Sequence, residues 1–128
     1  MKKHNFREKL VSTYLKEINL SKKIKSYFLG RKILVTGGAG AIGSNLVIAL
    51  SELVGNDGVI IVLDNLSAIN SNKPIDLPSL KNIMFVYGDV RNDIDLKRVF
   101  REKPTIVYHL AAFFANQNSL KIAAGEKT

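Results

Sequence analysis

Three glycines, each three residues apart, form the clearest candidate site in this sequence. Gly37, Gly40 and Gly43 follow an apolar, β-branched run at residues 33–35. A helix-like spacing of apolar residues begins within this turn, at Ala41. Glycine lets the chain turn sharply, lets the backbone approach a ligand without an intervening Cβ, and lets a helix pack closely on a strand. Because a helix begins here, its free N–H groups and positive dipole end would attract an anion such as a pyrophosphate.

A carboxylate follows at a spacing that extends this motif. Asp64 ends a second apolar run, residues 59–63, and lies 21 positions beyond Gly43. In dinucleotide-binding proteins an acidic residue follows the glycine turn by about 20 positions and accepts hydrogen bonds from the ribose hydroxyls. The same carboxylate would repel a 2′-phosphate. The sequence therefore favours NAD over NADP as the cofactor.

Simpler explanations exist for both features. The glycines could form a plain tight turn, and Asp64 could cap the turn that it begins with Asn65. A nucleotide-triphosphate P-loop is a further alternative, because Gly38 and Gly43 have the required separation. However, Ser44 stands where the phosphate-binding lysine should follow, which excludes that loop. The order and spacing of the glycines and the carboxylate together favour the dinucleotide site.

The elements around these residues alternate between strands and helices. Four short apolar runs predict buried strands, at residues 33–35, 59–63, 83–87 and 105–110. The spacing of apolar residues predicts a helix over 41–53 that ends at Gly55, and a later helix that Asp93 caps. Residues 65–82 show no sustained period and are predicted to be mostly loop. This order predicts an α/β protein: a partial Rossmann fold whose parallel sheet has the strand order 3-2-1-4.

An N-terminal helical extension over residues 1–30 precedes the first strand. Apolar residues recur at four-residue intervals and predict an amphipathic helix that packs on a larger body, with lysine and arginine on its other side: Phe6, Leu10, Tyr14 and Ile18, with Val11 and Leu15 alongside. Ser21 can cap a second short helix, and Gly30 can end it.

All of the excess positive charge lies in this extension. The formal net charge is +8, and residues 1–32 hold ten Lys or Arg against two Glu, whereas the remaining residues hold nine of each sign. Basic arms can bind nucleic acid or anionic lipid. A solvated basic helix face is the more common explanation at this length, so binding to nucleic acid is not predicted.

Length and composition are those of one globular domain. A chain of 128 residues has room for one hydrophobic core, which we assign to residues 31–119, with 120–128 as a tail. The sequence has no cysteine, which excludes disulfides and cysteine-based metal sites, and we predict no metal site. It has neither the apolar stretch of a signal peptide nor the roughly 20 apolar residues of a membrane span. A cytoplasmic location is therefore expected.

At these motifs the chain resembles the extended short-chain dehydrogenase/reductase family, whose members include nucleoside-diphosphate-sugar 4-epimerases, dehydratases and decarboxylases. The resemblance covers residues 31 to about 119. It depends on the glycine motif at 32–43, on the strand ends at 64–67 and 88–91, and on residues 109–112.

The resemblance implies a role for each of these segments. Asp89 would contact the adenine amino group, and Val90 would cover the ring. The small residues after the fourth strand would let the cofactor's central ribose and phosphates lie close to the backbone. Without the resemblance, a turn residue and ordinary packing would be the preferred explanations, and His109 is given no chemical role. The expected NAD contacts are Gly37, Gly40, Ala41, Ile42, Gly43, Asp64, Asn65, Asp89, Val90, Leu110, Ala111 and Ala112.

The catalytic pair of the resembled family has no counterpart in this sequence. Family members use a tyrosine and a lysine four residues later, but the tyrosines here are followed at that distance by Ile18, Arg31, Arg91 and Ala112. Tyr27 with Arg31 comes closest, yet it precedes the first strand, and the very high pKa of arginine suits that role poorly. No catalytic residue is assigned, and whether the chain is an enzyme is left open.

The resemblance implies the NAD-binding portion of a nucleotide-sugar epimerase or dehydratase, truncated or partial, that does not turn over its substrate alone. A non-catalytic dinucleotide-binding or sensing module is the alternative. Without a fifth strand, residues 105–110 would form an open apolar sheet edge, which predicts self-association.

Overall fold

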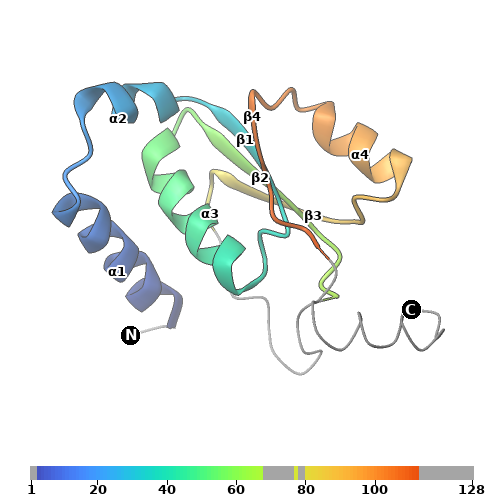
Figure 1. The fold of residues 1–128 in the computed structure, drawn as a ribbon, viewed down its shortest axis with the longest axis horizontal. Helices are drawn as coiled ribbons and strands as arrows, with labels where there is room; N and C mark the ends of the chain where they lie inside the picture. The colour runs from blue at the N-terminus through green and yellow to red at the C-terminus, as the bar shows by residue number, and fades with distance from the viewer. Residues whose placement is uncertain (1–2, 68–76, 78–79, 113–128) are drawn as a thin grey trace.

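The computed structural model describes residues 3–67, 77 and 80–112, with side chains from Phe6 onward (Figure 1). Its centre is a four-stranded parallel sheet in the order β3-β2-β1-β4, which confirms the predicted topology. The strands are β1 (Lys32–Thr36), β2 (Val59–Asp64), β3 (Ile83–Tyr87) and β4 (Ile106–His109). The fourth strand is thus shorter at both ends than the predicted range of 105–110.

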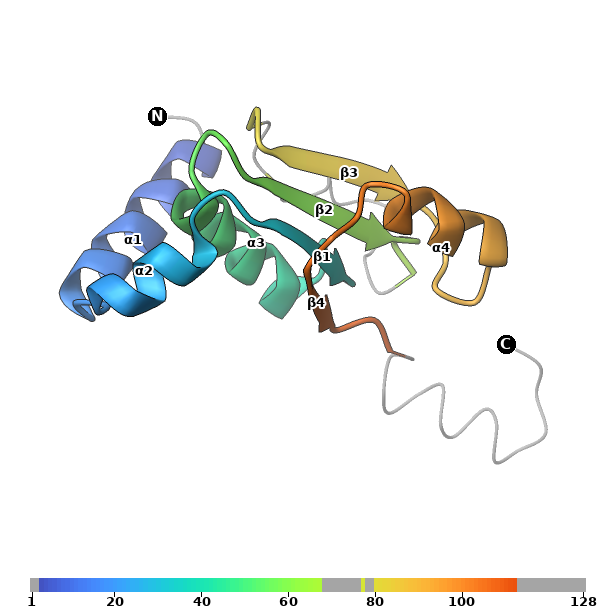
Figure 2. The same ribbon diagram turned by 90° about the horizontal axis from the view of Figure 1, so that it is seen from above.

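One helix covers each face of the sheet. Helix α3 (Ala41–Val54) lies on one face and α4 (Asp93–Phe100) on the other, as Figure 2 shows from above. Successive strand residues point to opposite faces, so Ile33 and Val35 pack with α3 while Leu34 packs in the cluster that contains Val99 of α4. Residues 33–36 of β1 and 60–63 of β2 are buried, which explains why these strands are continuously apolar at their centres rather than alternating.

The ends of these helices follow from short-range backbone chemistry. Gly55, with a φ of +70°, ends α3 as predicted, and the last helical residue is Val54, one residue beyond the predicted range of 41–53. The prediction that Asp93 caps α4 is wrong by one position, because the side chain of Asn92 accepts hydrogen bonds from the N–H groups of Ile94 and Asp95. Asp93 is instead the first residue of the helix, where its negative charge interacts favourably with the positive end of the helix dipole.

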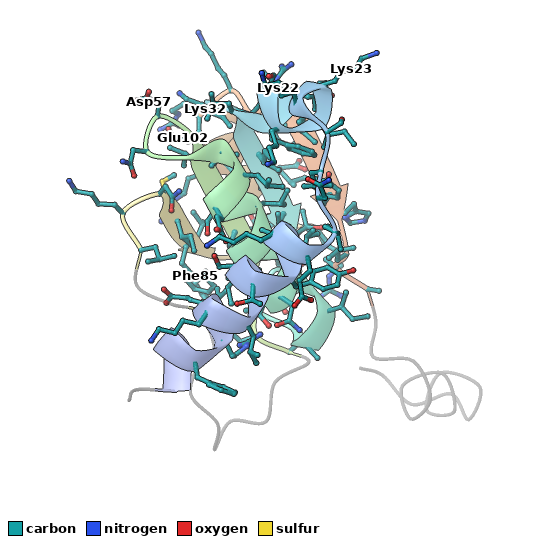
Figure 3. The ribbon with its side chains drawn as sticks, turned by 90° about the vertical axis from the view of Figure 1, so that its left-hand side faces the viewer. Lys22, Lys23, Lys32, Asp57, Phe85 and Glu102 are labelled. Carbon is teal, nitrogen blue, oxygen red and sulfur yellow. The ribbon has the colours of Figure 1, made fainter. Side chains whose placement is uncertain are left out.

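The N-terminal extension forms two helices, α1 (Lys3–Glu17) and α2 (Lys22–Phe28); in the view of Figure 3, α1 lies in front of α3, and α2 lies at the top of the molecule. Ser21 caps α2 as predicted, because its hydroxyl accepts a hydrogen bond from the N–H of Ile24. Gly30, with a φ of +75°, follows the end of α2.

The predicted packing face of α1 is right for Val11 and Leu15, which are half-buried, and wrong for the residues spaced by four. The residues spaced by four are all exposed: Phe6, Leu10, Tyr14 and Ile18. The half-buried face carries Val11, Leu15 and the polar residues Arg7 and Ser12, whose side chains bond to α3. Hydrogen bonding to polar groups of α3 thus selects a face that a purely apolar pattern does not indicate.

Several predictions fall outside the described residues. These concern most of the predicted loop at 65–82 and the tail at 120–128. In the described part of the chain, no helix has the length and apolar character that a membrane crossing requires.

Candidate functional site

The predicted site residues all lie at or just beyond the carboxyl ends of strands. Because the sheet is parallel, these ends lie along one edge: Thr36 is in register with Leu63 of β2 and with His109 of β4, and Asp64 is in register with Tyr87 of β3. The four loops beyond them are joined by hydrogen bonds between neighbours. The structure therefore brings the glycine turn, Asp64, Asp89 and the residues after β4 together at this edge.

The glycine turn packs closely on its neighbours. Gly37 has a φ of +73° and donates its N–H to the carbonyl of Leu63 at 2.8 Å. A Cβ added at Gly37 would lie 2.8 Å from the backbone nitrogen of Ala111, and one added at Gly43 would collide with the carbonyl oxygen of Gly37. Glycine at these two positions lets β1 approach the loop after β4 and lets α3 start directly beneath the turn.

Gly40 differs from its neighbours because it has room around it. Its backbone is extended, and a Cβ added there would meet only the carbonyl oxygen of Gly37, at an ordinary 3.5 Å. The next residues, Ala41 and Ile42, are exposed, and Ile42 is 79% exposed. The N–H groups of Ala41, Ile42 and Gly43 have no acceptor within the helix, because the first helical hydrogen bond runs from the N–H of Ser44 to the carbonyl of Gly40. The first turn of α3 therefore presents donors and a positive dipole end to open space.

Asp64 connects two turns through its carboxylate. It accepts a hydrogen bond from the N–H of Ala39 at 3.0 Å and another from the N–H of Leu66 at 2.7 Å. The second bond is the simple turn cap anticipated from the sequence, and it holds Leu66 at a φ of +62°. The first ties β2 to the glycine turn. Each carboxylate oxygen can accept a further hydrogen bond, so the half-buried Asp64 has capacity for a hydroxyl ligand.

Asp89 is held by hydrogen bonds to two neighbours. Its Oδ2 accepts from the side-chain amide of Asn65 at 3.0 Å and from Arg91 at 2.8 Å, while its Oδ1 accepts from the backbone and side chain of Arg91. The Arg91 guanidinium, followed by the Arg91 N–H and Asn65, holds the pKa of Asp89 well below its usual range. The carboxylate is therefore ionised above the ordinary pKa of an aspartate, and its contacts are lost only as the pH falls through the lowered value.

Helix α4 fixes the loop that carries Asp89 and Val90. Asp95 in the first turn of α4 accepts a hydrogen bond from the N–H of Asp89 at 2.9 Å. Its carboxylate packs against Gly88, where an added Cβ would lie 2.8 Å away. Val90 is half-buried and packs against the core cluster beneath α4. Asp95 is a positioning residue that the sequence did not reveal.

The buried hydroxyl of Thr36 ties the end of β1 to the end of β4. Its Oγ1 accepts from the N–H of Ala111 at 3.3 Å and lies 2.6 Å from Nδ1 of His109. The carbonyl of Thr36 also accepts from the N–H of Leu110 at 3.0 Å. Here His109 has a structural partner, and Leu110 and Ala112 are exposed at the strand end.

The pair of Tyr27 and Arg31 lies at the opposite end of the sheet. Arg31 stacks 4.7 Å over the ring of Tyr27 and donates to its backbone carbonyl at 2.8 Å. Both precede Lys32, the first residue of β1, whereas the glycine turn follows the last one. In the described ranges no group of His, Asp and Glu side chains could hold a metal ion.

This arrangement agrees with what comparison with known proteins finds. A sequence model of the NAD dependent epimerase/dehydratase family matches residues 33–125. The chain belongs to this family. The match includes the glycine turn and all four strand ends, so it covers the whole edge described above.

Known epimerases are similar to this chain in both sequence and structure. CDP-paratose 2-epimerase from Salmonella typhi is 42% identical over 92 residues, which are 70% of this chain and 26% of that protein. Epimerase Mth375 from Methanothermobacter thermautotrophicus superimposes with a TM-score of 0.68 at 45% identity, over 80% of this chain and 29% of that one. The chain thus spans between a quarter and a third of the length of these relatives.

A further structural relative was solved with a cofactor. The Bordetella bronchiseptica enzyme WbmF, in complex with NAD+, superimposes with a TM-score of 0.64 at 30% identity, over 78% of this chain and 28% of that one. The cofactor class expected from the sequence is therefore the cofactor class of the family and of this relative.

Proposed function

We propose that the carboxyl edge of this sheet binds NAD, and that the chain is the cofactor-holding part of a nucleoside-diphosphate-sugar epimerase or dehydratase. The observation that carries the proposal is the hydrogen bond from Ala39 to Asp64. It joins the anion-attracting glycine turn to a carboxylate with spare acceptor capacity. A dinucleotide needs both of these features within one ligand's length.

The glycine turn suits the pyrophosphate. The N–H groups of Ala41, Ile42 and Gly43 have no acceptor within the helix, and they lie at the positive end of α3. Gly40 leaves the space in front of them free of a side chain. These residues would bind the pyrophosphate oxygens through backbone donors.

The two carboxylates suit the adenosine half. Asp64 would accept hydrogen bonds from the ribose hydroxyls in addition to its two backbone donors. Asp89, which Asn65 and Arg91 keep ionised, already accepts four hydrogen bonds, so the adenine amino group would replace one bond from the exposed Arg91 side chain, with Val90 beside the ring. Leu110, Ala111 and Ala112 would line the opposite side, toward the central ribose and phosphates.

Bound NAD would supply reversible hydride transfer to and from the sugar. The residues of this chain would hold the cofactor and orient it, because no tyrosine in the 128 residues has a lysine four positions later. That pattern equally favours the alternative of a non-catalytic sensing module, which would use the same site. In this proposal, the part of the relatives' length that this chain does not cover would bind the nucleotide sugar and would supply the acid and base groups.

Titration with NAD and with NADP tests the role of Asp64 most simply. We expect NAD to bind at least tenfold more tightly, because NADP lacks the 2′-hydroxyl that would donate to Asp64, and a hydrogen bond to a charged group contributes roughly 1.5–3 kcal/mol. Isothermal titration calorimetry measures both affinities. Asp64→Asn should reduce or remove the difference, whereas Asp57→Asn, at an exposed carboxylate before β2, should leave it unchanged. Equal affinities of the unaltered chain for NAD and NADP would contradict the role of Asp64.

A further inference from the structure

Arg7 connects the N-terminal extension to the first turn of α3. Its Nη2 donates to the hydroxyl of Ser44 at 2.9 Å and to the side-chain oxygen of Asn45 at 2.6 Å. Ser44 is 2% exposed, so this contact lies in the interface between α1 and α3. The residues that Arg7 contacts immediately follow Gly43, the last glycine of the turn.

The contact extends to the backbone at the very start of α3. The hydroxyl of Ser44 and the amide nitrogen of Asn45 both donate to the carbonyl of Ala41, at 3.4 and 3.2 Å. Ala41 is also an exposed residue whose N–H has no acceptor within the helix. Arg7 therefore fixes the two side chains that brace the turn on which the pyrophosphate would lie.

The charge of Arg7 has an unusual location. A positive group near the start of a helix opposes the helix dipole, and helices ordinarily place acidic residues there. Helix α3 has no acidic residue in its first turn. The helix dipole and Arg7 thus both contribute positive potential at this end of α3, which favours an anion bound nearby.

We propose that Arg7 is a positioning residue of the cofactor site, and that α1 is connected to that site through this residue. Arg7 holds the first turn of α3 in place and adds positive potential where the pyrophosphate binds. This inference depends on the proposed binding of NAD. It assigns to the basic extension a role in cofactor affinity. A second contact between α1 and α3 offers a matched control, because the hydroxyl of Ser12 donates to Glu52 near the far end of α3 at 2.8 Å.

The experiment compares three variants of the full chain, Arg7→Gln, Arg7→Lys and Ser12→Ala, by calorimetric titration with NAD and with adenosine. We expect Arg7→Gln to lower the affinity for NAD about fivefold and to leave that for adenosine unchanged, because adenosine has no pyrophosphate. Arg7→Lys should restore part of the loss by restoring the charge. Ser12→Ala, which removes a different bond between α1 and α3, should bind NAD as the unaltered chain does.

The salt dependence of NAD affinity distinguishes an effect of the charge of Arg7 from an effect of its contact between α1 and α3. The affinity of the unaltered chain for NAD should fall more steeply with potassium chloride than that of Arg7→Gln, because screening weakens a contribution that the variant lacks. Arg7→Gln that binds NAD within twofold of the unaltered chain would overturn the inference, as would an equal loss for adenosine or for Ser12→Ala. An unaltered chain that does not bind NAD would instead overturn the proposed function, and this inference with it.

Discussion

Gly40 and Gly43 lie three residues apart in one turn, yet their surroundings differ. A side chain at Gly43 would collide with the carbonyl of Gly37, whereas a Cβ at Gly40 meets nothing closer than 3.5 Å. Gly43 is thus required by packing within the protein. Gly40 is not, and its lack of a side chain becomes useful only when a ligand occupies the space in front of the turn.

Gly40→Val tests whether a ligand occupies that space. The extended backbone at Gly40 suits a β-branched residue, so we expect the thermal midpoint of unfolding to change little. The isopropyl group would point toward the pyrophosphate, so NAD should no longer raise that midpoint. A thermal-shift titration checks both outcomes in one experiment. Stabilisation of Gly40→Val by NAD equal to that of the unaltered chain would show that the turn does not contact the ligand.

The residue-level predictions divide according to the range of the interaction. The glycine spacing and Asp64 follow from local rules, because a turn, a helix start and a strand end each have a sequence signal. Asp95 and Arg7 do not, since their partners lie 6 and 37 residues away and no spacing rule relates them. Their roles required the structure.

Helix α3 depends on close contact between its first turn and the glycine turn that follows β1. At Gly43, alanine would favour the helix by about 1 kcal/mol through its higher propensity. The added Cβ would also meet the Cα of Gly38 at 2.8 Å, as well as the Gly37 carbonyl. Overpacking of this kind costs about 1–3 kcal/mol, so the steric cost should prevail.

Gly43→Ala should therefore lower the free energy of unfolding, which denaturant titration measures. Gly40→Ala is the matched control, because the same change three residues earlier has room for its Cβ and should alter stability by less than about 1 kcal/mol. A Gly43→Ala chain at least as stable as the unaltered one would mean that α3 can move away from the turn.

Element boundaries were predictable to within one or two residues, but the orientation of α1 was not. Burial determines β1 and β2, so their apolar runs suffice. In α1, apolar residues occupy two faces, and the choice between them depends on Arg7 and Ser12, which bond to polar groups of α3. A pattern of apolar spacing contains no information about those partners.

The whole sheet has β3 at one edge and β4 at the other. Within the described residues β4 pairs with β1 alone, and Val107 is 47% exposed. Exposed apolar strand edges recruit other strands. We therefore keep the prediction that this chain self-associates, through β4 rather than through the cofactor site.

Val107→Lys should reduce self-association, because a lysine on an edge strand opposes edge-to-edge pairing. Light scattering at tens of micromolar measures the mass of the unaltered chain and of the variant. Thr105→Lys, an exposed position just before β4, controls for the added charge. A monodisperse monomer of the unaltered chain would rule out pairing through this edge.

The most direct test of the central claim is to locate NAD on the chain by nuclear magnetic resonance. In a titration of the isotope-labelled chain, we expect the backbone amides of Ala41, Ile42 and Gly43 to shift most, together with those after Asp64 and Asp89. The cavity between α1, α3 and the residues just before β3, lined by Glu8, Ile48 and Lys81 among others, should be unaffected. Shifts confined to that cavity, or no shifts at saturating NAD, would contradict a dinucleotide site at the carboxyl edge of the sheet.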